Sequence, residues 1–532
     1  MTSNTVKAGT FISVLFVIIA LFYRRQVDDV LKDRLNSILE GLVKVEKQCS
    51  VDTRPKVAVG YGACNDLFID GKELLKYDAV AESPEHFNEI SSTEELLKTY
   101  AYFFRHGAAA ERYISNDTLF DAIVDIASRI EGSHFALGGN APVMAKRFFL
   151  EGCEVLLAAK MTPKLQESLP KGVRVVGRDI KKDDVHLILE YKEDEDWGIY
   201  RSPRANRFIV HNDHNNPLVS SLEEFDQLLK EFNPNLLVIS GLQMMDNYPY
   251  PKGVREQRLL KIRDQMVAQL PSTRVHFEMA SFAEAELLHQ LAQYITPYAD
   301  SLGMNEQELA NLYNMMMYGN ISFVSDSNPR VATVLDQMRE IFHLESRNRV
   351  MKENSRQLTR LHVHTLAYQA ILTVKNSPWK NSKAAAAKAS LTANRHVCGS
   401  KEVDIEKAKL IMDDSFSTSI AAGSRRVPLD VEQPVSCWDE ELNGRSHNRK
   451  RLLDGSPVLQ YVCIIKHIDN VWTRDSDWLL AGRVERVCHL SCTSSTTPNY
   501  LASTVVTLLY QPEVSTDVNI VAIFLQVPDF IF

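Results

Sequence analysis

Asn235–Ser240 reads NLLVIS, Arg255–Leu270 reads REQRLLKIRDQMVAQL, and Arg274–Met279 reads RVHFEM. The outer two segments are short and mostly apolar, as in buried strands, whereas the middle segment mixes charged and apolar residues at helical spacing. A strand, a helix and a strand in this order predict a crossover between two parallel strands. Because ligands bind at the carboxyl ends of parallel strands, we expect functional side chains just after each strand.

The same alternation continues along most of the chain. Further strands are expected at Val57–Tyr61, Glu154–Ala159, His186–Tyr191, Phe208–His211 and Arg360–Thr365. Further helices are expected at Asp117–Ser128, Ala141–Glu151, Phe282–Ile295, Glu306–Met317, Pro329–Leu344 and Ser382–Ala393. Ser92-x-x-Glu95 and Ser221-x-x-Glu224 match the capping-box pattern of a helix start. The pattern predicts an α/β fold with a mainly parallel sheet covered by helices on both faces.

Length and composition limit the possible classes of protein. The 532 residues exceed what one core usually organises, so we expect one large domain of two lobes with appendages. The net charge of −8 argues against nucleic-acid binding, which requires clustered Lys and Arg. The basic run Arg445–Arg451 is interpreted as a solvated loop. The 8 cysteines are too scattered for a zinc site, although isolated disulfides remain open.

The N-terminus carries a separate signal. Ala8–Tyr23 is an almost unbroken apolar run that ends before Arg24 and Arg25. Its length lies between a signal-peptide core and the ~20 residues of a spanning helix, and no clear cleavage site follows. We therefore expect residues 1–25 to form an uncleaved signal anchor, with a buried N-terminal helix as the alternative. Residues 26–54 have apolar positions at helical spacing and are expected to form a helical stem.

The same segment predicts the compartment. A signal anchor places the body at the endoplasmic reticulum, membrane-anchored or lumenal, with secretion as the alternative. The sequons that begin at Asn116 and Asn320 are compatible with a lumenal body, although such triplets also occur by chance. The charges that flank the apolar run leave its membrane orientation open.

Three polar motifs follow predicted strands or open predicted helices. Gly138, Gly139 and Asn140 open a helix, where free N–H groups suit an oxygen-rich or anionic ligand; a plain turn is the alternative. In His276-x-Glu278, at a strand end, the carboxylate could hold Mg²⁺ directly or through water. In Asn305-x-x-Glu308, at a helix start, the carboxylate could face the same ion. A strand-edge acid and an ordinary capped helix start are the simpler interpretations of these last two motifs.

Taken together, these motifs resemble those of the ADP-dependent sugar kinases. Gly-Gly-Asn/Gln, His-x-Glu and Asn-x-x-Glu occur here in the order of that family. Longer runs resemble its animal glucokinases: HLILEY at 186–191, ANRFI at 205–209, LGMNEQEL at 302–309, and residues 361–366 followed by WKN at 379–381. The resemblance covers about residues 55–437, which we take as the kinase domain. It implies a ribokinase-like three-layer sandwich with a mainly parallel central sheet and a smaller lid built from inserted strands.

The resemblance also implies a reaction. The β-phosphoryl group of Mg-ADP would pass to the 6-hydroxyl of glucose, giving glucose 6-phosphate and AMP in glycolysis, and we expect a monomer. The implied sugar-binding residues are Asp66, Glu111, Gly138, Gly139, Asn140 and His186; Arg207 would bind the ADP phosphates, and Glu278 and Glu308 would position Mg²⁺ with support from His276 and Asn305. This arrangement requires the two metal-binding acids to face the Gly138-Gly139 turn across one cleft.

Several of the residues implied by the resemblance also have a simpler interpretation, and one position departs from the family. Asp66 could be a turn carboxylate, Glu111 could pair with a neighbouring Arg, and His186 could be a core histidine. The Asn that often precedes the sugar-binding Asp in the family is replaced here by Gly62. As implied by the resemblance, Glu111 favours glucose over fructose 6-phosphate, because a carboxylate repels a phosphate. His362 and His364 could approach the nucleotide or fill the sheet interior.

The C-terminal part departs from the family. The family's catalytic base is the Asp of a Gly-x-Gly-Asp sequence, and after residue 437 this chain has only Gly444, Gly455 and Gly482. We therefore assign no catalytic residue and expect residues 438–532 to be a divergent tail that packs poorly on the sheet. Asp454, Asp469 and Asp475 are possible substitutes. The alternative to an active glucokinase is a membrane-tethered pseudokinase that binds sugar or nucleotide without turnover.

Overall fold

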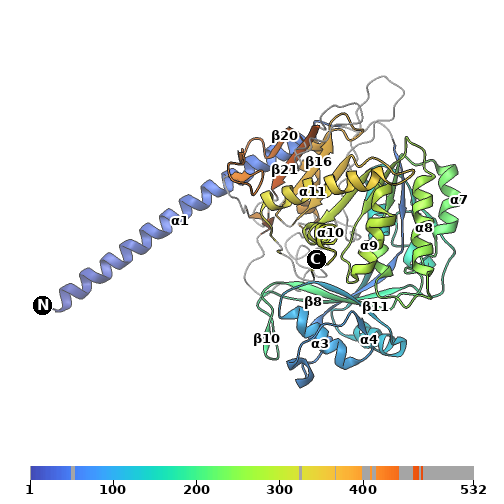
Figure 1. Cartoon of the computed structure of the whole chain (residues 1–532). Helices are drawn as coiled ribbons and strands as arrows, with labels where there is room; N and C mark the ends of the chain where they lie inside the picture. Colours follow the sequence, from blue (N-terminus) through green and yellow to red (C-terminus); the bar gives the residue numbers. More distant parts are fainter. Residues whose placement is uncertain are drawn as a thin grey trace.

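The computed structural model describes residues 2–49, 54–322, 326, 328–365, 367–397, 408–409, 415–441, 459–466 and 469–470. The elements form two lobes, each built on one β-sheet, with a long N-terminal helix projecting from the larger lobe (Figure 1). The larger lobe holds a ten-stranded sheet and the smaller lobe, the lid, a six-stranded sheet.

The large sheet is parallel from β7 to β15 and antiparallel beyond. Its strands, in spatial order, are β20 (Val435–Glu441), β21 (Leu459–Lys466), β16 (Tyr368–Val374), β15 (Arg360–His364), β14 (Ser301–Asn305), β13 (Arg274–Glu278), β12 (Leu236–Ile239), β1 (Lys56–Gly60), β6 (Glu154–Ala158) and β7 (Arg174–Val176). Every strand predicted for this sheet forms within a residue or two of its expected bounds.

Helices cover both faces of this sheet, as predicted. One face packs against α7 (Leu222–Phe232), α8 (Val254–Val267), α9 (Ala285–Tyr294), α10 (Glu306–Tyr318) and α11 (Val331–Val350). The other face packs against α5 (Asn140–Leu150), α12 (Ser382–Val397) and the end of α1 (Thr2–Glu46). Because residues of one strand alternate between the two cores, as Ala58 and Val57 do, the strands are buried on both sides. The three-layer prediction is confirmed.

The lid is built from two insertions into the large lobe, one between β1 and α5 and one between β7 and α7. Its strands, in spatial order, are β3 (Glu89–Ile90), β4 (Ala110–Ile114), β11 (Asn206–His211), β8 (Val185–Tyr191), β2 (Cys64–Asp70) and β5 (His134–Gly138). Its outer face packs on α3 (Thr93–Phe104) and α4 (Asp117–Arg129). The other face lies toward the large lobe (Figure 1).

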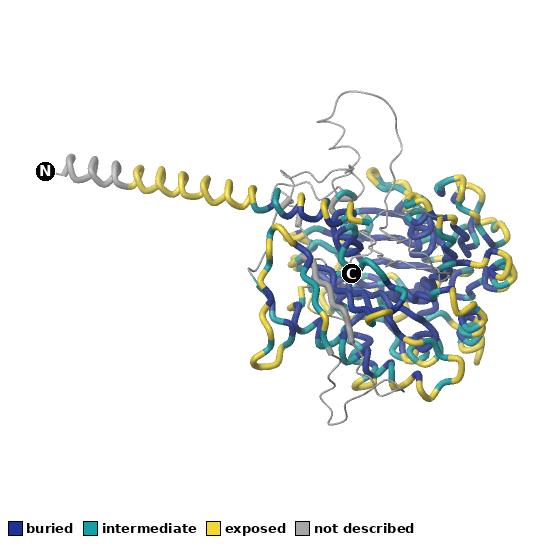
Figure 2. Tube along the Cα trace, turned by 90° about the horizontal axis from the view of Figure 1, so that it is seen from above, coloured by how far each residue is buried: buried dark blue, intermediate teal, exposed yellow. Residues whose placement is uncertain are grey.

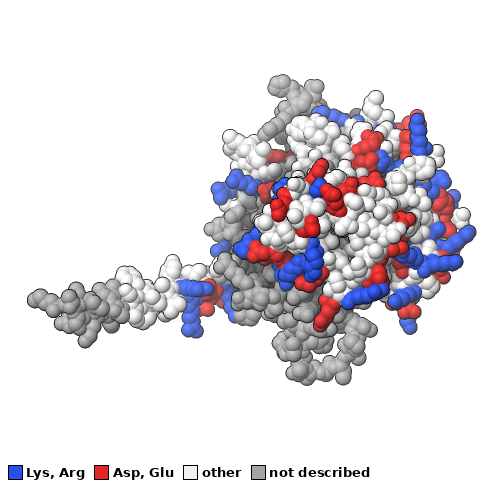
Figure 3. All heavy atoms as spheres, turned by 90° about the horizontal axis from the view of Figure 1, so that it is seen from below, with Lys and Arg blue, Asp and Glu red and all other residues white. Residues whose placement is uncertain are grey.

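Short elements complete the described fold. They are the helices α2 (Gly71–Leu74) and α6 (Pro163–Gln166), the hairpin of β9 (Asp196–Trp197) and β10 (Tyr200–Arg201), and the strand pairs β17 (Ala408–Lys409) with β22 (Asp469–Asn470) and β18 (Ser415–Ser417) with β19 (Arg426–Pro428). On the face shown in Figure 3, the basic and acidic side chains of the described residues are interspersed.

The N-terminal apolar run and the stem form one continuous helix, α1. Its last turns are buried: Leu35, Ile38, Leu39 and Leu42 pack on the alanine-rich start of α12. From Val14 to Leu31 its apolar side chains are exposed, and Figure 2 shows this part of the helix in yellow, projecting from the rest of the chain. Side chains before residue 13 lie outside the described part of the chain. Among the described residues, no helix is both long and apolar enough to cross a membrane.

The start of the predicted tail belongs to the large sheet. β20 pairs with β21, and β21 pairs with β16 through seven residues, Tyr368 to Val374. Within the stretch 438–532 that we expected to pack poorly, residues 438–441 and 459–466 therefore pair within the large sheet. The apolar pattern LQYVCIIK of β21 was sufficient for a strand, although helix periodicity had ended. Residues 442–458, 467–468 and 471–532, with the possible bases Asp454 and Asp475, lie outside the described residues.

Two predicted helix starts differ in their capping. At the start of α3 the hydroxyl of Ser92 accepts a hydrogen bond from the backbone N–H of Glu95 at 3.3 Å. The return bond goes to Ser91 rather than Ser92, because the carboxylate of Glu95 accepts from the N–H of Ser91 at 2.6 Å. At the start of α7, Ser221 makes no capping bond and has helical dihedral angles. The capping box predicted at Ser221 is therefore wrong.

Candidate functional site

The lid sheet brings polar residues from several strands into one row. Asp66 of β2 lies directly opposite His186 of β8, and His186 lies opposite His211 of β11. Glu111 of β4 is opposite Ile209, two residues before His211, so its side chain is on the same face as the two histidines. Leu187 and Val210, which point the other way, are buried against the lid helices. The row therefore faces the large lobe.

The carboxylates of Glu111 and Asp213 flank the two histidines. His186 places Nδ1 at 3.5 Å from Oε1 of Glu111 and Nε2 at 3.1 Å from both oxygens of Asp213. His211 places Nε2 at 4.0 Å from the same Glu111 oxygen and Nδ1 at 3.4 Å from Asp213. Burial alone would lower the pKa of His186, but Asp213, Glu111 and Asp66 outweigh it and raise that pKa to about 10. Despite its burial, Asp213 has a pKa far below the usual range because it faces both rings.

Asp66 lies beside the glycine turn that was predicted to complete the sugar pocket. A Cβ atom on Gly138 would overlap the carboxylate of Asp66, so any larger residue would have to displace that carboxylate. Gly139 has a φ of +88° and stands at the start of α5. Burial raises the pKa of Asp66 to about 6, although His186, the Cys64 thiol and Arg207 each act to lower it. The structure thus brings Asp66, Gly138, His186 and Glu111 together.

The first residue of α5, Asn140, has a feature expected of a ligand contact. Its side chain is 6% exposed, and its carbonyl oxygen has no hydrogen-bond partner among the residues that the structure describes. A buried oxygen of this kind is costly to leave unpaired, so a hydroxyl donor from a ligand would stabilise it. Arg207 is nearly buried on β11 and lies four residues before His211, which places it on the same face of the lid.

Sequence reasoning missed three members of this cluster: His211, Asp213 and Asn216. The amide of Asn216 donates to Asp213 at 2.7 Å, and it bonds both backbone groups of Ala63 at 3.0 Å. A side chain at Gly62 would meet the Asn216 oxygen, so Asn216 occupies the space that Gly62 leaves. The run HNDHNN at 211–216 begins on the last residue of a predicted strand, and the expectation that functional side chains follow strand ends could have identified it.

The two predicted metal-binding acids lie at the ends of neighbouring strands of the large sheet, because β13 ends at Glu278 and β14 leads into α10. Glu278 accepts hydrogen bonds from His276 at 2.8 Å and from His364 at 3.3 Å, and these bonds, against the effect of burial, lower its pKa to about 2. Both oxygens of Glu308 face Asn305 in a complete capping box. Burial raises the pKa of Glu308 to about 8.

His362 and His364 differ in role within the same strand. His362 lies 2.5 Å from Gln369 on the neighbouring strand and is buried inside the sheet, where desolvation and the nearby Arg360 hold its pKa far below the usual value. His364 contacts Glu278 at the strand end. That Glu278 and Glu308 share one cleft with the Gly138-Gly139 turn stays a prediction.

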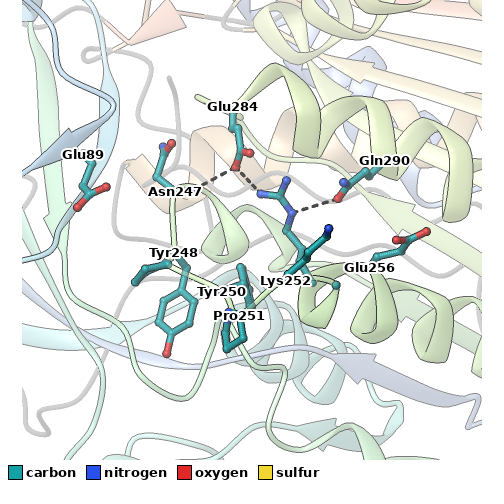
Figure 4. A pocket seen from close by; sticks show the side chains of 12 residues that line it. Glu89, Asn247, Tyr248, Tyr250, Pro251, Lys252, Glu256, Glu284 and Gln290 are labelled. Carbon is teal, nitrogen blue, oxygen red and sulfur yellow. Dashed lines mark hydrogen bonds and ion pairs between the residues drawn. The ribbon is translucent and has the colours of Figure 1, made fainter.

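A separate cavity of about 450 Å³ lies where β3 of the lid approaches α8 and α9. Figure 4 shows Glu89 on one side and Asn247 with Glu284 on the other. Glu284 forms an ion pair with Arg255, which also lines the cavity. None of the predicted site residues lines it. Aromatic ring contacts connect this cavity with the lid cluster. The ring centres of Tyr248, in the cavity, and Tyr113 are 5.9 Å apart, and those of Tyr113 and His211 are 5.7 Å apart.

Residues 55–464 match the model of a family described as "ADP-specific Phosphofructokinase/Glucokinase conserved region". The chain belongs to this family. The match ends at residue 464 rather than near 437, and it therefore includes β20 and most of β21. Membership makes the chain a kinase with the predicted α/β fold.

Two relatives in the family of ADP-specific kinases cover most of the chain. A bovine (Bos taurus) ADP-dependent glucokinase is 34% identical over 395 residues, which are 73% of this chain and 78% of the relative. A probable ADP-dependent glucokinase of Caenorhabditis elegans is 27% identical over 398 residues, with the same shares. The solved structure of an ADP-dependent kinase complex with fructose-6-phosphate and ADPβS has a TM-score of 0.54 at 17% identity, covering 86% of this chain and 97% of that one. This last likeness supports the fold.

Proposed function

We propose that this chain is an ADP-dependent glucokinase, which transfers the β-phosphoryl group of Mg-ADP to the 6-hydroxyl of glucose and releases glucose 6-phosphate and AMP. The observation that carries the proposal is the position of Glu111 in the lid cluster, beside His186 and on the face that holds Asp66. Carboxylates and imidazoles at this spacing suit the hydroxyl groups of an uncharged sugar. The acidic cluster would repel the phosphate of fructose 6-phosphate. The bovine and nematode relatives carry the glucokinase name.

Mg²⁺ is part of this proposal. Glu278 and Glu308 supply the hard carboxylate oxygens that Mg²⁺ prefers, and each is buried at a strand end or helix start of the large lobe. Neither belongs to a compact group of three metal-ligating side chains within the described part of the chain. Contact through water therefore fits these residues better than direct coordination. His276 would orient Glu278, and Asn305 would orient Glu308. The ion, when bound, would offset charge on the transferred phosphoryl group.

The proposal is tested by measuring AMP and glucose 6-phosphate formation by the full chain from glucose and Mg-ADP, with fructose 6-phosphate as the competing acceptor. Glu111→Gln keeps the shape of the side chain and removes its charge. We expect this variant to bind glucose about tenfold more weakly, because a charged acceptor is stronger than a neutral one. We also expect it to discriminate less against fructose 6-phosphate. Equal use of both sugars by the unsubstituted chain would refute the proposed specificity.

One observation favours a second candidate, a pseudokinase that binds sugar and nucleotide without turnover. After residue 437 the sequence has no two glycines in the spacing of Gly-x-Gly-Asp, so the family's base and its neighbouring amides are missing. Removing a general base and an anion-binding donor each cost orders of magnitude in rate in other enzymes. A chimaera with a Gly-x-Gly-Asp ending separates the candidates. If only the chimaera phosphorylates glucose, the unsubstituted chain is the pseudokinase. If neither protein binds glucose, both candidates fail.

We further propose that α1 tethers a monomeric body to the membrane of the endoplasmic reticulum. The exposed apolar side chains from Val14 to Tyr23 would be covered there, and Cys437, which is disulfide-bonded, favours an oxidising compartment. Treatment of sealed microsomes with protease and with carbonate tests this. A protected, carbonate-resistant full-length chain is expected, whereas a chain that washes off with carbonate would contradict the tether. Light scattering of the detergent-solubilised chain checks the monomer.

A further inference from the structure

Asp213 is the most enclosed acid of the lid cluster, with none of its surface exposed, and the sugar-binding residues implied by the family do not include it. It comes two residues after the end of β11 and faces His186, His211 and Asn216. The position of Asp213 is fixed by hydrogen bonds to the loop that follows it. Asp184 accepts hydrogen bonds from the N–H groups of residues 214, 215 and 216 at 2.9–3.1 Å, which holds the loop that carries Asp213.

Both nitrogens of the His186 ring face carboxylates. Nε2 lies 3.1 Å from both oxygens of Asp213, and Nδ1 lies 3.5 Å from Oε1 of Glu111. A neutral imidazole has one N–H and one lone pair, so one of its nitrogens would point a lone pair at a carboxylate. Only the imidazolium form satisfies both neighbours. The raised pKa of His186 agrees with this geometry.

The other groups that surround His186 support the same charge state. Asp66 approaches from β2, Glu111 from β4 and Asp213 from the loop after β11, so three acids face the ring. His211 of β11 lies beside it with ring centres 4.8 Å apart. The Cys64 thiol donates to Asp66 at 3.2 Å rather than to the ring. Arg207 of β11 acts on Asp66, and Glu111 and Asp213 remain facing the ring, so a positive charge on His186 relieves the repulsion between these acids.

We propose that Asp213 is a positioning residue that fixes both the orientation and the positive charge of His186, and through that ring holds the Glu111 carboxylate for the sugar. Both histidines lie nearest Oε1 of Glu111, and this leaves Oε2 to accept from a sugar hydroxyl. Sugar binding by this pocket is therefore insensitive to pH near neutrality. The consequence for sugar rests on the proposed function, whereas the charge on His186 does not.

The first experiment measures the His186 charge directly in the full chain, labelled with ¹³C at the histidine Cε1 positions and titrated by NMR. His186→Gln assigns the signal. We expect His186 to remain an imidazolium from pH 6 to 8.5. In Asp213→Asn the ring keeps its burial and loses its main partner, so it should become neutral within that range. Asp125→Asn, the matched control, removes an exposed carboxylate of α4 that lies outside the cluster, and it should leave His186 charged.

The second experiment measures glucose binding by calorimetry from pH 6 to 8.5, which needs no turnover. The unsubstituted chain and Asp125→Asn should each show a constant affinity above pH 7, where the Asp66 carboxyl, with its pKa raised to about 6, is ionised. Asp213→Asn should lose about tenfold in affinity between pH 6 and 8.5, because deprotonation leaves the acids unpaired. A weaker but pH-independent affinity in Asp213→Asn would show a merely structural role and overturn the proposal.

The two experiments also separate this proposal from the glucokinase proposal. If glucose does not bind to the unsubstituted chain, the proposed function fails, while the NMR titration still decides the charge on His186. A neutral His186 in the unsubstituted chain overturns the inference whatever the sugar result. The ligand atoms of His186, His211 and Asp213 lie within 4.8 Å of one another, so elemental analysis completes the test. One tightly bound zinc per chain, lost in Asp213→Asn, would also overturn it.

Discussion

The lid cluster and the strand-end acids of the large lobe both combine carboxylates with histidine or asparagine, but they differ in how far apart in sequence the partners lie. In the lid, Asp213 and Glu111 reach His186 from different strands and loops, 27 and 75 residues away in sequence. In the large lobe, Glu278 is held by His276 two residues before it, and Glu308 by Asn305 three residues before it. The first arrangement depends on strand register, whereas the second is mostly local.

This difference determines what each site can do. The lid acids share one buried imidazolium, and the result is a charged, preorganised surface that suits neutral hydroxyl groups. Glu308 is buried and accepts hydrogen bonds from the neutral N–H groups of Asn305, so burial makes its ionised form costly until a cation approaches. We infer that the lid is organised before sugar binds, while the carboxylates of the large lobe gain most from a bound metal ion.

The largest expected effect comes from a matched pair of glycine substitutions, one in each region. A Cβ atom at Gly138 would overlap the carboxylate of Asp66, and one at Gly303 would overlap that of Glu278. Neither glycine needs a left-handed backbone, so alanine acts through the displaced carboxylate. Gly138→Ala should weaken glucose binding, and Gly303→Ala should weaken Mg-ADP binding, each by roughly tenfold to a hundredfold, as expected for about 1–3 kcal/mol of overpacking.

Calorimetry with each ligand separately checks this pair, and circular dichroism confirms that both variants fold. The informative measurement is the binding of each variant to the ligand of the other region: Gly138→Ala should bind Mg-ADP normally, and Gly303→Ala should bind glucose normally. If each substitution weakens both ligands equally, the two regions are parts of one coupled site, and the comparison drawn above fails.

Half of the large sheet could be predicted from sequence because its signals are local: β1, β6, β12, β13 and β15 were expected, whereas β7, β14, β16, β20 and β21 were not. The βαβ unit of β12, α8 and β13 follows from two apolar runs and one amphipathic helix, and Glu278 follows from its place at a strand end. Asn305-x-x-Glu308 is a helix-start pattern that the structure contains in full.

The lid could be predicted only in part. Its strands β8 and β11 were expected, but β2, β4 and β5 were not, because their polar and small residues do not alternate clearly. The spacing of Asp213 and His186 in the sequence does not indicate that they are in contact. The register between β8 and β11 brings them together. Such contacts need the strand order, and composition or periodicity does not provide it. The glucokinase resemblance supplied Asp66, Glu111 and His186, and it could not supply their partner.

A smaller effect is expected at the helix start that carries Glu308. Asn305→Ala removes the cap of α10, and Asn116→Ala removes the equivalent cap of α4 in the lid, where Asn116 accepts from Leu119 at 3.0 Å. Each should lower the free energy of unfolding by about 1 kcal/mol, measured by urea denaturation. Only Asn305→Ala should also weaken Mg²⁺-dependent ADP binding, because Glu308 loses the side-chain amide donor and keeps only the backbone N–H of residue 305. Identical binding by both variants would remove Glu308 from the proposed metal site.

The smallest expected effect compares two serines that look alike in sequence. Ser92 caps α3 of the lid through the N–H of Glu95, whereas Ser221 makes no such bond before α7 of the large lobe. Ser92→Ala should therefore cost about 1 kcal/mol of unfolding free energy, and Ser221→Ala less than about 0.5 kcal/mol. The asymmetry has a structural cause: Ser221 already has helical dihedral angles, so its hydroxyl is not directed at the third N–H of the helix. Equal losses in the two variants would mean that Ser221 does cap α7 in solution, and the sequence pattern would then have been the better guide at that position.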